Sequence, residues 1–341
     1  MRIGLTYDLA EDWAADGLDA EDLAEFDAPE TIDAIADFVR AQGHRAVRIG
    51  RAQALVSLLA EGERWDLVFN ICEGARGAGR EALVPALLDA SAIPYTFSDP
   101  VVLAIALHKG HTKRILRDAG LPTAPFAVLG PDSTLPDLPF PLFVKPIAEG
   151  TGKGIDDASL CRDAAALRAT AARLASRFGQ EVLAETYLPG REFTVGVLGA
   201  GAHARIIGVM EILAGTTYGF ETKKHYQNRV SYRLAHDPEA MAAGAAALAA
   251  WRVLGGRDGG RIDLKSNAEG KPMLLEVNPL AGLHPIDSDL TILANLAGHT
   301  HEWLLGQIFA SASARAGLTW QRALPPGLAR LPSEAAVAAL K

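Results

Sequence analysis

Cysteine is scarce in this chain of 341 residues, which contains only Cys72 and Cys161. Two cysteines so far apart do not make a disulfide framework, and this usage favours a reducing cytoplasm. Zinc-type Cys/His spacings and the Gly-x-Ser-x-Gly elbow of hydrolases are also lacking. No apolar run approaches the roughly 20 residues that a membrane span needs. The first residues, MRIGLTYDLAEDW, soon turn acidic, so we expect no secretory signal.

Basic stripes are lacking as well. The chain has 33 Lys and Arg residues against 41 Asp and Glu residues, which gives a net charge of −8. Nucleic acid is therefore not an expected partner. Apolar residues, in contrast, make up 49% of the chain, enough for a large core divided among two or three domains.

Strand and helix patterns alternate in the first part of the chain. Short apolar runs predict strands at residues 1–7, 46–50 and 65–72, and apolar residues at helical spacing predict helices at 30–44 and 80–93. This alternation predicts an α/β unit with a parallel sheet.

Two further units follow in the sequence. A helical stretch at residues 101–120 opens the second unit, which ends with an Ala-rich helix at 164–178 and a strand. The third unit contains a polar loop at 216–233 and a long Ala-rich helix at 238–254. The predicted domains are residues 1–97, 98–184 and 185–341.

The segment GRIDLKSNAEGKPMLLEVNPLAGL, from Gly260 to Leu283, reads as a hairpin because a turn-rich connection separates two apolar runs. Pairing of the runs would bring Asp263 close to Glu276 and Asn278. The latter two are two residues apart and share one face of a strand. Three oxygen ligands on one face suit Mg²⁺, and the alternative is a solvent-facing hairpin with ordinary polar positions.

A glycine-rich loop follows an apolar strand in VKPIAEGTGKGI, residues 144–155. Lys145 ends the strand, and the glycines, Gly150 and Gly152 among them, allow backbone N–H groups to surround an anion such as phosphate. The loop matches neither the Walker nor the Rossmann pattern, and a plain turn is the alternative. Lys109 is a second candidate for phosphate and Glu192 a candidate for ribose hydroxyls, although, taken in isolation, a solvated helix lysine and a surface strand end are the simpler explanations.

The order of these pieces resembles the ATP-grasp fold, and more closely the D-alanine–D-alanine ligase family. The resemblance rests on Lys109, FVKPIAEGTGKG, AETYLPGREFTVGVLG and GRIDL…LLEVNP, and it extends from the first strand to about Gln307. It implies a mixed α/β, three-domain ATP-grasp fold whose N-terminal domain has a parallel sheet. It further implies a cytoplasmic homodimer that uses ATP, one or two Mg²⁺ ions that Mn²⁺ can replace, and small carboxylate and amine substrates such as amino acids.

The resemblance also assigns nucleotide contacts. Lys109 and Lys145 match the lysines that contact the phosphates of ATP. The loop with Gly150 and Gly152 matches the flexible loop that closes over them, and Thr151 stands where the family usually has Ser. The remaining matches are Glu185 with the backbone near Leu188 for adenine, Glu192 for ribose, and Lys223 for the nucleotide.

The same resemblance assigns the reacting centre. Asp263, Glu276 and Asn278 match the Mg²⁺ ligands, Arg261 matches the arginine that steadies the acyl-phosphate and the tetrahedral intermediate, and Gly282 matches the oxyanion site. The implied reaction has two steps: a carboxylate attacks the γ-phosphate of ATP, and an amine then displaces phosphate from the acyl-phosphate. Arg261 and Asp263 are two residues apart, so both point to one face of their strand.

Departures from the family pattern concentrate on the substrate side. The first strand leads into a long acidic segment in which Glu25, Asp27 or Glu30 is a candidate for binding an amino group. Glu73 stands at the place of a family His, and Lys224 at that of a family Tyr. Near the acceptor site, His284, Asp287 and Ser288 are candidates for the second substrate. A solvated or indirect role is the alternative for each.

Three functions therefore remain open. The first is an ATP-dependent carboxylate–amine ligase that makes a dipeptide or dipeptide-like amide, either from another amino acid pair or, as a D-alanine–D-alanine ligase of cell-wall synthesis, from D-alanine alone. The second is an ATP-grasp protein that binds nucleotide without ligation. The third is a nicotinamide dehydrogenase, which the lack of Gly-x-Gly-x-x-Gly after the first strand opposes.

Overall fold

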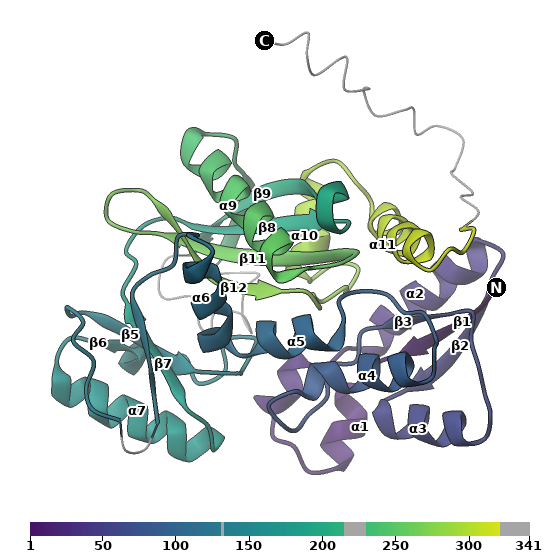
Figure 1. Cartoon of the computed structure of the whole chain (residues 1–341), viewed down its shortest axis with the longest axis horizontal. Helices are drawn as coiled ribbons and strands as arrows, with labels where there is room; N and C mark the ends of the chain where they lie inside the picture. The colour runs from purple at the N-terminus through teal and green to yellow at the C-terminus, as the bar shows by residue number, and fades with distance from the viewer. Residues whose placement is uncertain (131–132, 215–229, 321–341) are drawn as a thin grey trace, which may run out of the picture.

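The computed structural model describes residues 1–130, 133–214 and 230–320. Within these residues the strands form a three-stranded, a four-stranded and a five-stranded sheet, which follow one another along the chain (Figure 1). The predicted mixed α/β class is confirmed. None of the described helices is long and apolar enough to cross a membrane.

The strands are, in chain order, β1 Arg2–Thr6, β2 Arg45–Gly50, β3 Leu67–Asn70, β4 Phe126–Leu129, β5 Leu142–Pro146, β6 Leu160–Cys161, β7 Val182–Thr186, β8 Glu192–Leu198, β9 Arg205–Ala214, β10 Val230–Leu234, β11 Gly259–Ser266 and β12 Pro272–Asn278. The α-helices are α1 Ala10–Ala15, α2 Pro29–Ala41, α3 Ala52–Ala60, α4 Leu83–Ala90, α5 Pro100–Leu107, α6 Lys109–Asp118, α7 Ala164–Phe178, α9 Pro238–Leu254, α10 Asp289–Leu296 and α11 His301–Arg315.

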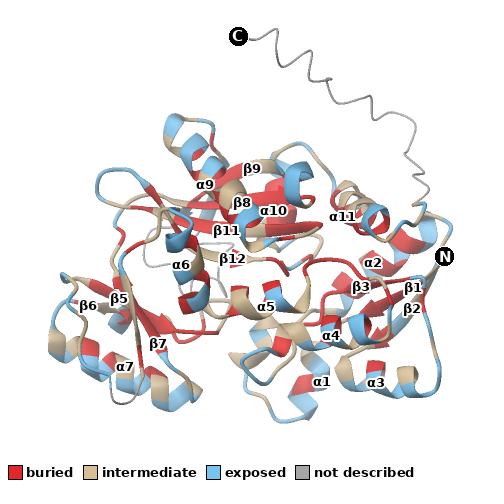
Figure 2. Ribbon diagram, viewed as in Figure 1, coloured by how far each residue is buried: buried red, intermediate tan, exposed pale blue. Residues whose placement is uncertain are grey.

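The N-terminal sheet has the order β2-β1-β3 with all pairs parallel, as the alternation of strands and helices predicts. The helix predicted at residues 30–44 is α2. It buries Ile32, Ile35 and Val39, whereas its other face meets solvent (Figure 2). Every residue of β3 is buried, which is typical of a parallel strand that is covered on both faces.

The two later sheets are antiparallel. The central sheet has the order β4-β7-β5-β6 and is covered by α7, which buries Leu167 and Leu174. The C-terminal sheet has the order β10-β9-β8-β11-β12. The small side chains of α9 let this helix lie close to the sheet, with Trp251 fully buried between them. Helix α6 lies between the central and C-terminal sheets and contacts β12 (Figure 1).

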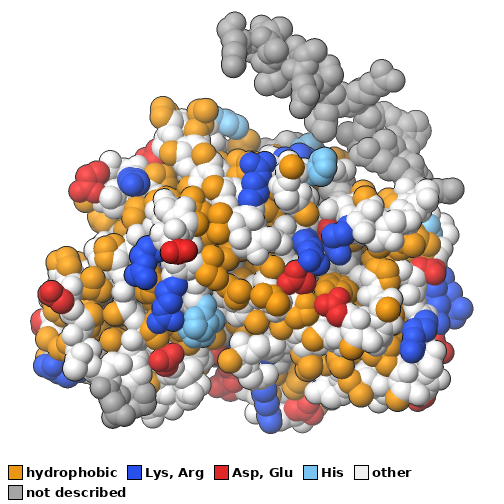
Figure 3. All heavy atoms as spheres, viewed as in Figure 1, with side chains coloured by type: hydrophobic (Ala, Val, Ile, Leu, Met, Phe, Trp, Pro, Cys, Tyr) orange, Lys and Arg blue, Asp and Glu red, His pale blue; other side chains and the backbone are white. Residues whose placement is uncertain are grey.

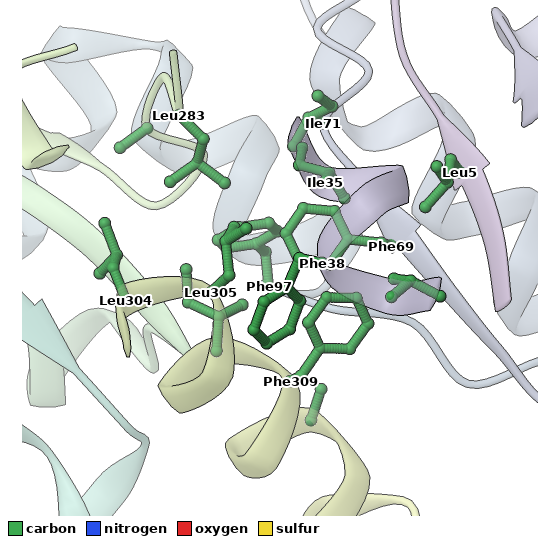
Figure 4. Packing of buried hydrophobic residues seen from close by; sticks show 14 of the residues in the cluster. Leu5, Ile35, Phe38, Phe69, Ile71, Phe97, Leu283, Leu304, Leu305 and Phe309 are labelled. Atoms are coloured by element: carbon green, nitrogen blue, oxygen red, sulfur yellow. The ribbon is translucent and has the colours of Figure 1, made fainter. Parts of the chain in front are cut away.

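One hydrophobic core joins the N-terminal unit to the end of the described chain. Phe309 of α11 stacks on Phe69 with ring centroids 4.7 Å apart and on Phe38 at 5.7 Å (Figure 4). Leu283 and Leu304 belong to the same cluster. Helices α10 and α11 were not expected from the sequence, although they supply much of this core.

Several expected boundaries differ in the structure. The helix expected at 80–93 is a 3₁₀ turn followed by α4. The stretch at 101–120 is two helices, because His108 is extended and caps α6. The end of the expected loop at 216–233 is strand β10. The expected domain boundary after residue 184 falls inside β7, so this strand stays with the central sheet.

Candidate active site

The hairpin of β11 and β12 pairs as predicted. Asp263 lies directly opposite Glu276, and the amide nitrogen of Asn278 donates to Asp263 Oδ2 at 3.1 Å. The register shifts beside Asp263, which leaves Leu275 as an extra residue, so that Leu275 and Glu276 both line the adjoining pocket. Thr194 of the neighbouring strand donates its hydroxyl to Asp263 Oδ1 at 2.8 Å.

Cations lie beside these carboxylates. Arg261 forms an ion pair with Asp263, and its Nη1 is 3.6 Å from Asp289 Oδ2. Lys109 Nζ is 3.5 Å from Glu276 Oε2 and donates to the backbone carbonyl of Glu149 at 2.5 Å. The hairpin therefore meets positive charge from its own strand and from the start of α6.

A second group of charges is buried between the sheets. Glu185 on β7 pairs through Oε1 with Lys145 Nζ and through Oε2 with Lys113 Nζ, both at 2.8 Å. Burial would raise the pKa of Glu185, but the two lysines hold it well below its ordinary range. Burial lowers the pKa of Lys113, whereas for Lys145 the carboxylates of Glu185 and Glu276 outweigh burial and raise the pKa.

The glycine-rich loop contacts carboxylates of the acidic segment. Gly150 donates its N–H to Glu25 Oε1 at 2.7 Å, and Lys153 Nζ lies 2.7 Å from Glu25 Oε2. Gly154 donates its N–H to Glu21 at 2.9 Å. Burial would raise the pKa of Glu25, but Arg80 and Lys153 hold it below its ordinary value. In this structure the backbone donors of the loop thus bind carboxylates of the acidic segment.

Residues from the hairpin, the buried charges and the glycine-rich loop line one pocket with a volume of about 390 Å³, within the usual range for a small-molecule site. Its wall includes most of the candidate nucleotide and metal residues: Lys109, Lys145, Gly150, Gly152, Glu185, Leu188, Glu192, Arg261, Asp263 and Glu276. Beside the pocket, Thr151 has a positive φ of 51°, a backbone conformation that favours glycine. Lys265, which no motif had indicated, pairs with Glu192 at 2.8 Å.

The candidate acceptor residues form a separate group after β12. A Cβ added at Gly282 would lie 2.9 Å from Ser288 Oγ, so this backbone passes close to the serine. Ser288 Oγ accepts a hydrogen bond from the His284 N–H at 2.8 Å. Asp287 is exposed, and its Oδ2 lies 3.7 Å from Nδ1 of the His284 ring. The pocket lining therefore does not include this group.

The acidic candidates differ in their surroundings. Glu30 is exposed at the start of α2. Burial, Glu25 and Glu81 raise the pKa of Glu73 well above its ordinary value. Asp27 lies near Asp8, and burial together with that charge raises its pKa to about 7. Lys223 and Lys224 lie outside the described residues.

Sequence reasoning missed Lys113, Lys153 and the contact that Glu25 makes with the loop. Lys113 follows Lys109 by four residues on one helix, a spacing that places both side chains on one face and could have indicated it. The partners of Glu25 come from residues 80, 150 and 153, and no local pattern connects them.

The arrangement of the three sheets defines the class of fold to which the protein belongs. A solved D-alanine–D-alanine ligase from Bacillus anthracis, complexed with ATP, matches the chain with a TM-score of 0.72 at 21% identity. The match covers 93% of this chain and 99% of that one. A second solved structure of the D-alanine–D-alanine ligase from Bacillus anthracis gives a TM-score of 0.73. The predicted ATP-grasp fold is confirmed.

Sequence comparison identifies the family. Residues 115–310 match the family model described as D-ala D-ala ligase C-terminus. The D-alanine–D-alanine ligase of Bordetella petrii is 38% identical over 239 residues, 68% of this chain and 71% of that protein. That of Bordetella pertussis is 36% identical over 271 residues, 77% and 83% of the two chains. The chain belongs to the D-alanine–D-alanine ligase family of ATP-dependent ligases that form C–N bonds.

Proposed function

We propose that this protein uses ATP to activate a carboxylate as an acyl-phosphate and joins it to an amine, forming a dipeptide or dipeptide-like amide with release of ADP and phosphate. The observation that carries this proposal is the convergence of Asp263, Glu276, Arg261 and two lysines on one pocket. Phosphoryl transfer needs mainly positioned reactants and neutralised phosphate charge, and this set of residues is suited to both tasks.

At the nucleotide end, Lys109 and Lys145 are proposed to contact the phosphates, beneath the backbone donors of Gly150 and Gly152. The apolar side chain of Leu188 is proposed to pack on adenine, and Glu192 to accept from ribose hydroxyls. In this proposal a phosphate oxygen takes the Gly150 N–H that Glu25 now accepts. Arg261 would balance the negative charge that develops during acyl transfer, and Gly282 would lie at the acyl oxygen.

Mg²⁺ is proposed to bind Asp263, Glu276 and Asn278. Among the residues that the structure describes, no three His, Cys, Asp or Glu side chains cluster as a metal site, so the set needs the Asn278 amide for a third oxygen. Two opposed carboxylates and an amide are hard oxygen donors that fit Mg²⁺, and Mn²⁺ can replace it. Bound metal would neutralise charge on the β- and γ-phosphates.

The substrates are proposed to be small amino acids. Glu73, whose carboxyl group lies near Glu25, is a candidate for binding the amino group of the first substrate. Ser288 and Asp287 are candidates for binding the second substrate. The relatives carry the name D-alanine–D-alanine ligase, so D-alanine in both positions is the first pair to test. The acidic segment favours another amino acid pair, because Glu25, a candidate for binding an amino group, binds the glycine-rich loop instead.

We further propose a cytoplasmic homodimer with domains at 1–97, 98–186 and 187–341 that binds no nucleic acid. Its two cysteines are unpaired, which agrees with a reducing compartment. On the face in Figure 3, basic side chains are interspersed with acidic and hydrophobic ones rather than gathered into a stripe.

The test is phosphate release from ATP and Mg²⁺ with D- and L-amino acids, singly and in pairs, with products identified by mass. An amide product with equal amounts of phosphate supports the ligase. ATP binding without phosphate release for any pair would instead favour a nucleotide-binding protein without ligation. Release with D-alanine alone would identify the cell-wall reaction.

A further inference from the structure

Lys113 is a buried lysine that does not line the pocket. Its side chain is 1% exposed, and it lies on α6 one turn after Lys109. Removing an ammonium group from water costs several kcal/mol unless partners compensate. A lysine in such a place therefore needs an explanation beyond packing, because its aliphatic stem alone could be supplied by Leu or Met.

Two partners from different sheets hold this ammonium group. Nζ lies 2.8 Å from Glu185 Oε2 on β7 of the central sheet. It donates to the backbone carbonyl of Leu274 on β12 of the C-terminal sheet at 2.9 Å. β12 is the outer strand of its sheet, and on this side Leu274 forms an isolated parallel bridge with Thr123, its N–H donating to Pro122 at 2.8 Å. Lys113 thus joins the strand of Glu185 to the strand that carries Glu276.

The position of Lys113 also affects the net charge beside the proposed nucleotide site. Glu185 binds Lys145 through its other oxygen, so the group contains two cations and one anion. Without Lys113, the carboxylate would neutralise Lys145, and the buried pair would present no net charge to a phosphate. With Lys113, Glu185 is shared between two lysines, so it neutralises Lys145, the lysine that lines the pocket, less completely.

We propose that Lys113 is a positioning residue for nucleotide binding: it occupies one oxygen of Glu185 and is anchored on Leu274, which leaves the charge of Lys145 directed at the ATP phosphates. This inference rests on the proposed ATP site. It concerns a residue that acts through Glu185 and Lys145 and does not touch the nucleotide itself.

The test compares Lys113→Met with Arg114→Met. Methionine retains the length of the stem and removes the charge, and Arg114 is exposed on the same helix, so it is a matched control. Dissociation constants for ATP with Mg²⁺ and for adenosine are measured by calorimetry, at a temperature where melting curves show every variant folded. We expect Lys113→Met to weaken ATP about tenfold or more and adenosine less than about threefold, with Arg114→Met like wild type.

Two results would overturn the inference: ATP affinity within twofold of wild type in folded Lys113→Met, or equal losses for ATP and adenosine, which a purely structural role would produce. If Lys113→Met does not fold, the double variant Lys113→Met/Glu185→Gln removes both charges of that pair. It should recover at least the wild-type selectivity for ATP over adenosine, because no carboxylate of Glu185 is left to neutralise Lys145. A selectivity still about tenfold lower would contradict the inference, because the loss would then not act through Glu185. Failure of the wild-type protein to bind ATP would refute the proposed function itself, so the two failures are distinguishable.

Discussion

Replacing Asp258 by Ala should destabilise the contact between the first and last parts of the described chain. This residue is fully buried in the turn before β11. Its carboxylate accepts from the Phe97 N–H at 2.8 Å, the Ser311 hydroxyl at 2.8 Å and Arg315 Nη2 at 2.7 Å. Asp258 also has a φ of +62°, which Asp tolerates better than Ala. One side chain therefore joins segments about 160 residues apart.

The magnitude follows from what each partner can do after the change. The buried Phe97 N–H would lose its acceptor, which costs about 2 kcal/mol. The Arg315 side chain is 29% exposed and can be hydrated again, so its lost ion pair costs only about 1 kcal/mol. The left-handed backbone adds about 1 kcal/mol for Ala. The expected loss is about 4 kcal/mol, less than three independent charged hydrogen bonds would give, because the three bonds share one carboxylate.

Urea unfolding, followed by fluorescence and circular dichroism, would measure this loss. Asp258→Asn is the matched control, since Asn tolerates the same backbone conformation and keeps one acceptor, and it should lose about 2 kcal/mol. A loss below about 1 kcal/mol for Asp258→Ala would refute the reasoning. So would equal losses for the two variants, because the estimate depends on the remaining acceptor and the tolerated φ.

Four further predictions concern the site and its support. Asp263→Asn should lower phosphate release at least about 100-fold with an unchanged melting temperature, and a wild-type rate would contradict the metal assignment. Lys145→Ala should raise the apparent KM for ATP about tenfold or more in steady-state assays, so unchanged values would remove it from the site. Burial and Asp8 raise the pKa of Asp27 from 3.8 to about 7, so the stability that its proton contributes is complete below about pH 4 and is lost as pH rises through 7. Asp27→Asn should therefore cost less stability at pH 8 than at pH 5, and a pH-independent cost in urea unfolding would disprove the shift. Gly260→Ala would place a Cβ 2.6 Å from the Asn278 carbonyl oxygen and should cost about 1–3 kcal/mol in the same assay, whereas a neutral effect would mean that the hairpin yields.

Local patterns determined much of the fold. Helices α7 and α9 begin and end where their Ala-rich sequences predict, at Ala164–Phe178 and Pro238–Leu254. The hairpin pairing of Asp263 with Glu276 was also predictable, because a period of two residues and a short turn specify both face and partner. The order of the ATP-grasp motifs was sufficient to indicate the family. All of this information lies within short stretches of chain.

Only the tertiary structure decided which charges meet. Glu25 reaches a loop 125 residues away, and Lys113 reaches Leu274 161 residues away. The extra residue at Leu275 and the joining of α11 to the N-terminal core likewise depend on how whole units pack. Periodicity specifies which face of an element is buried, but it carries no information about which distant side chain will compensate a buried charge. That choice arises when the sheets come together, since each desolvated charge must then find its partner.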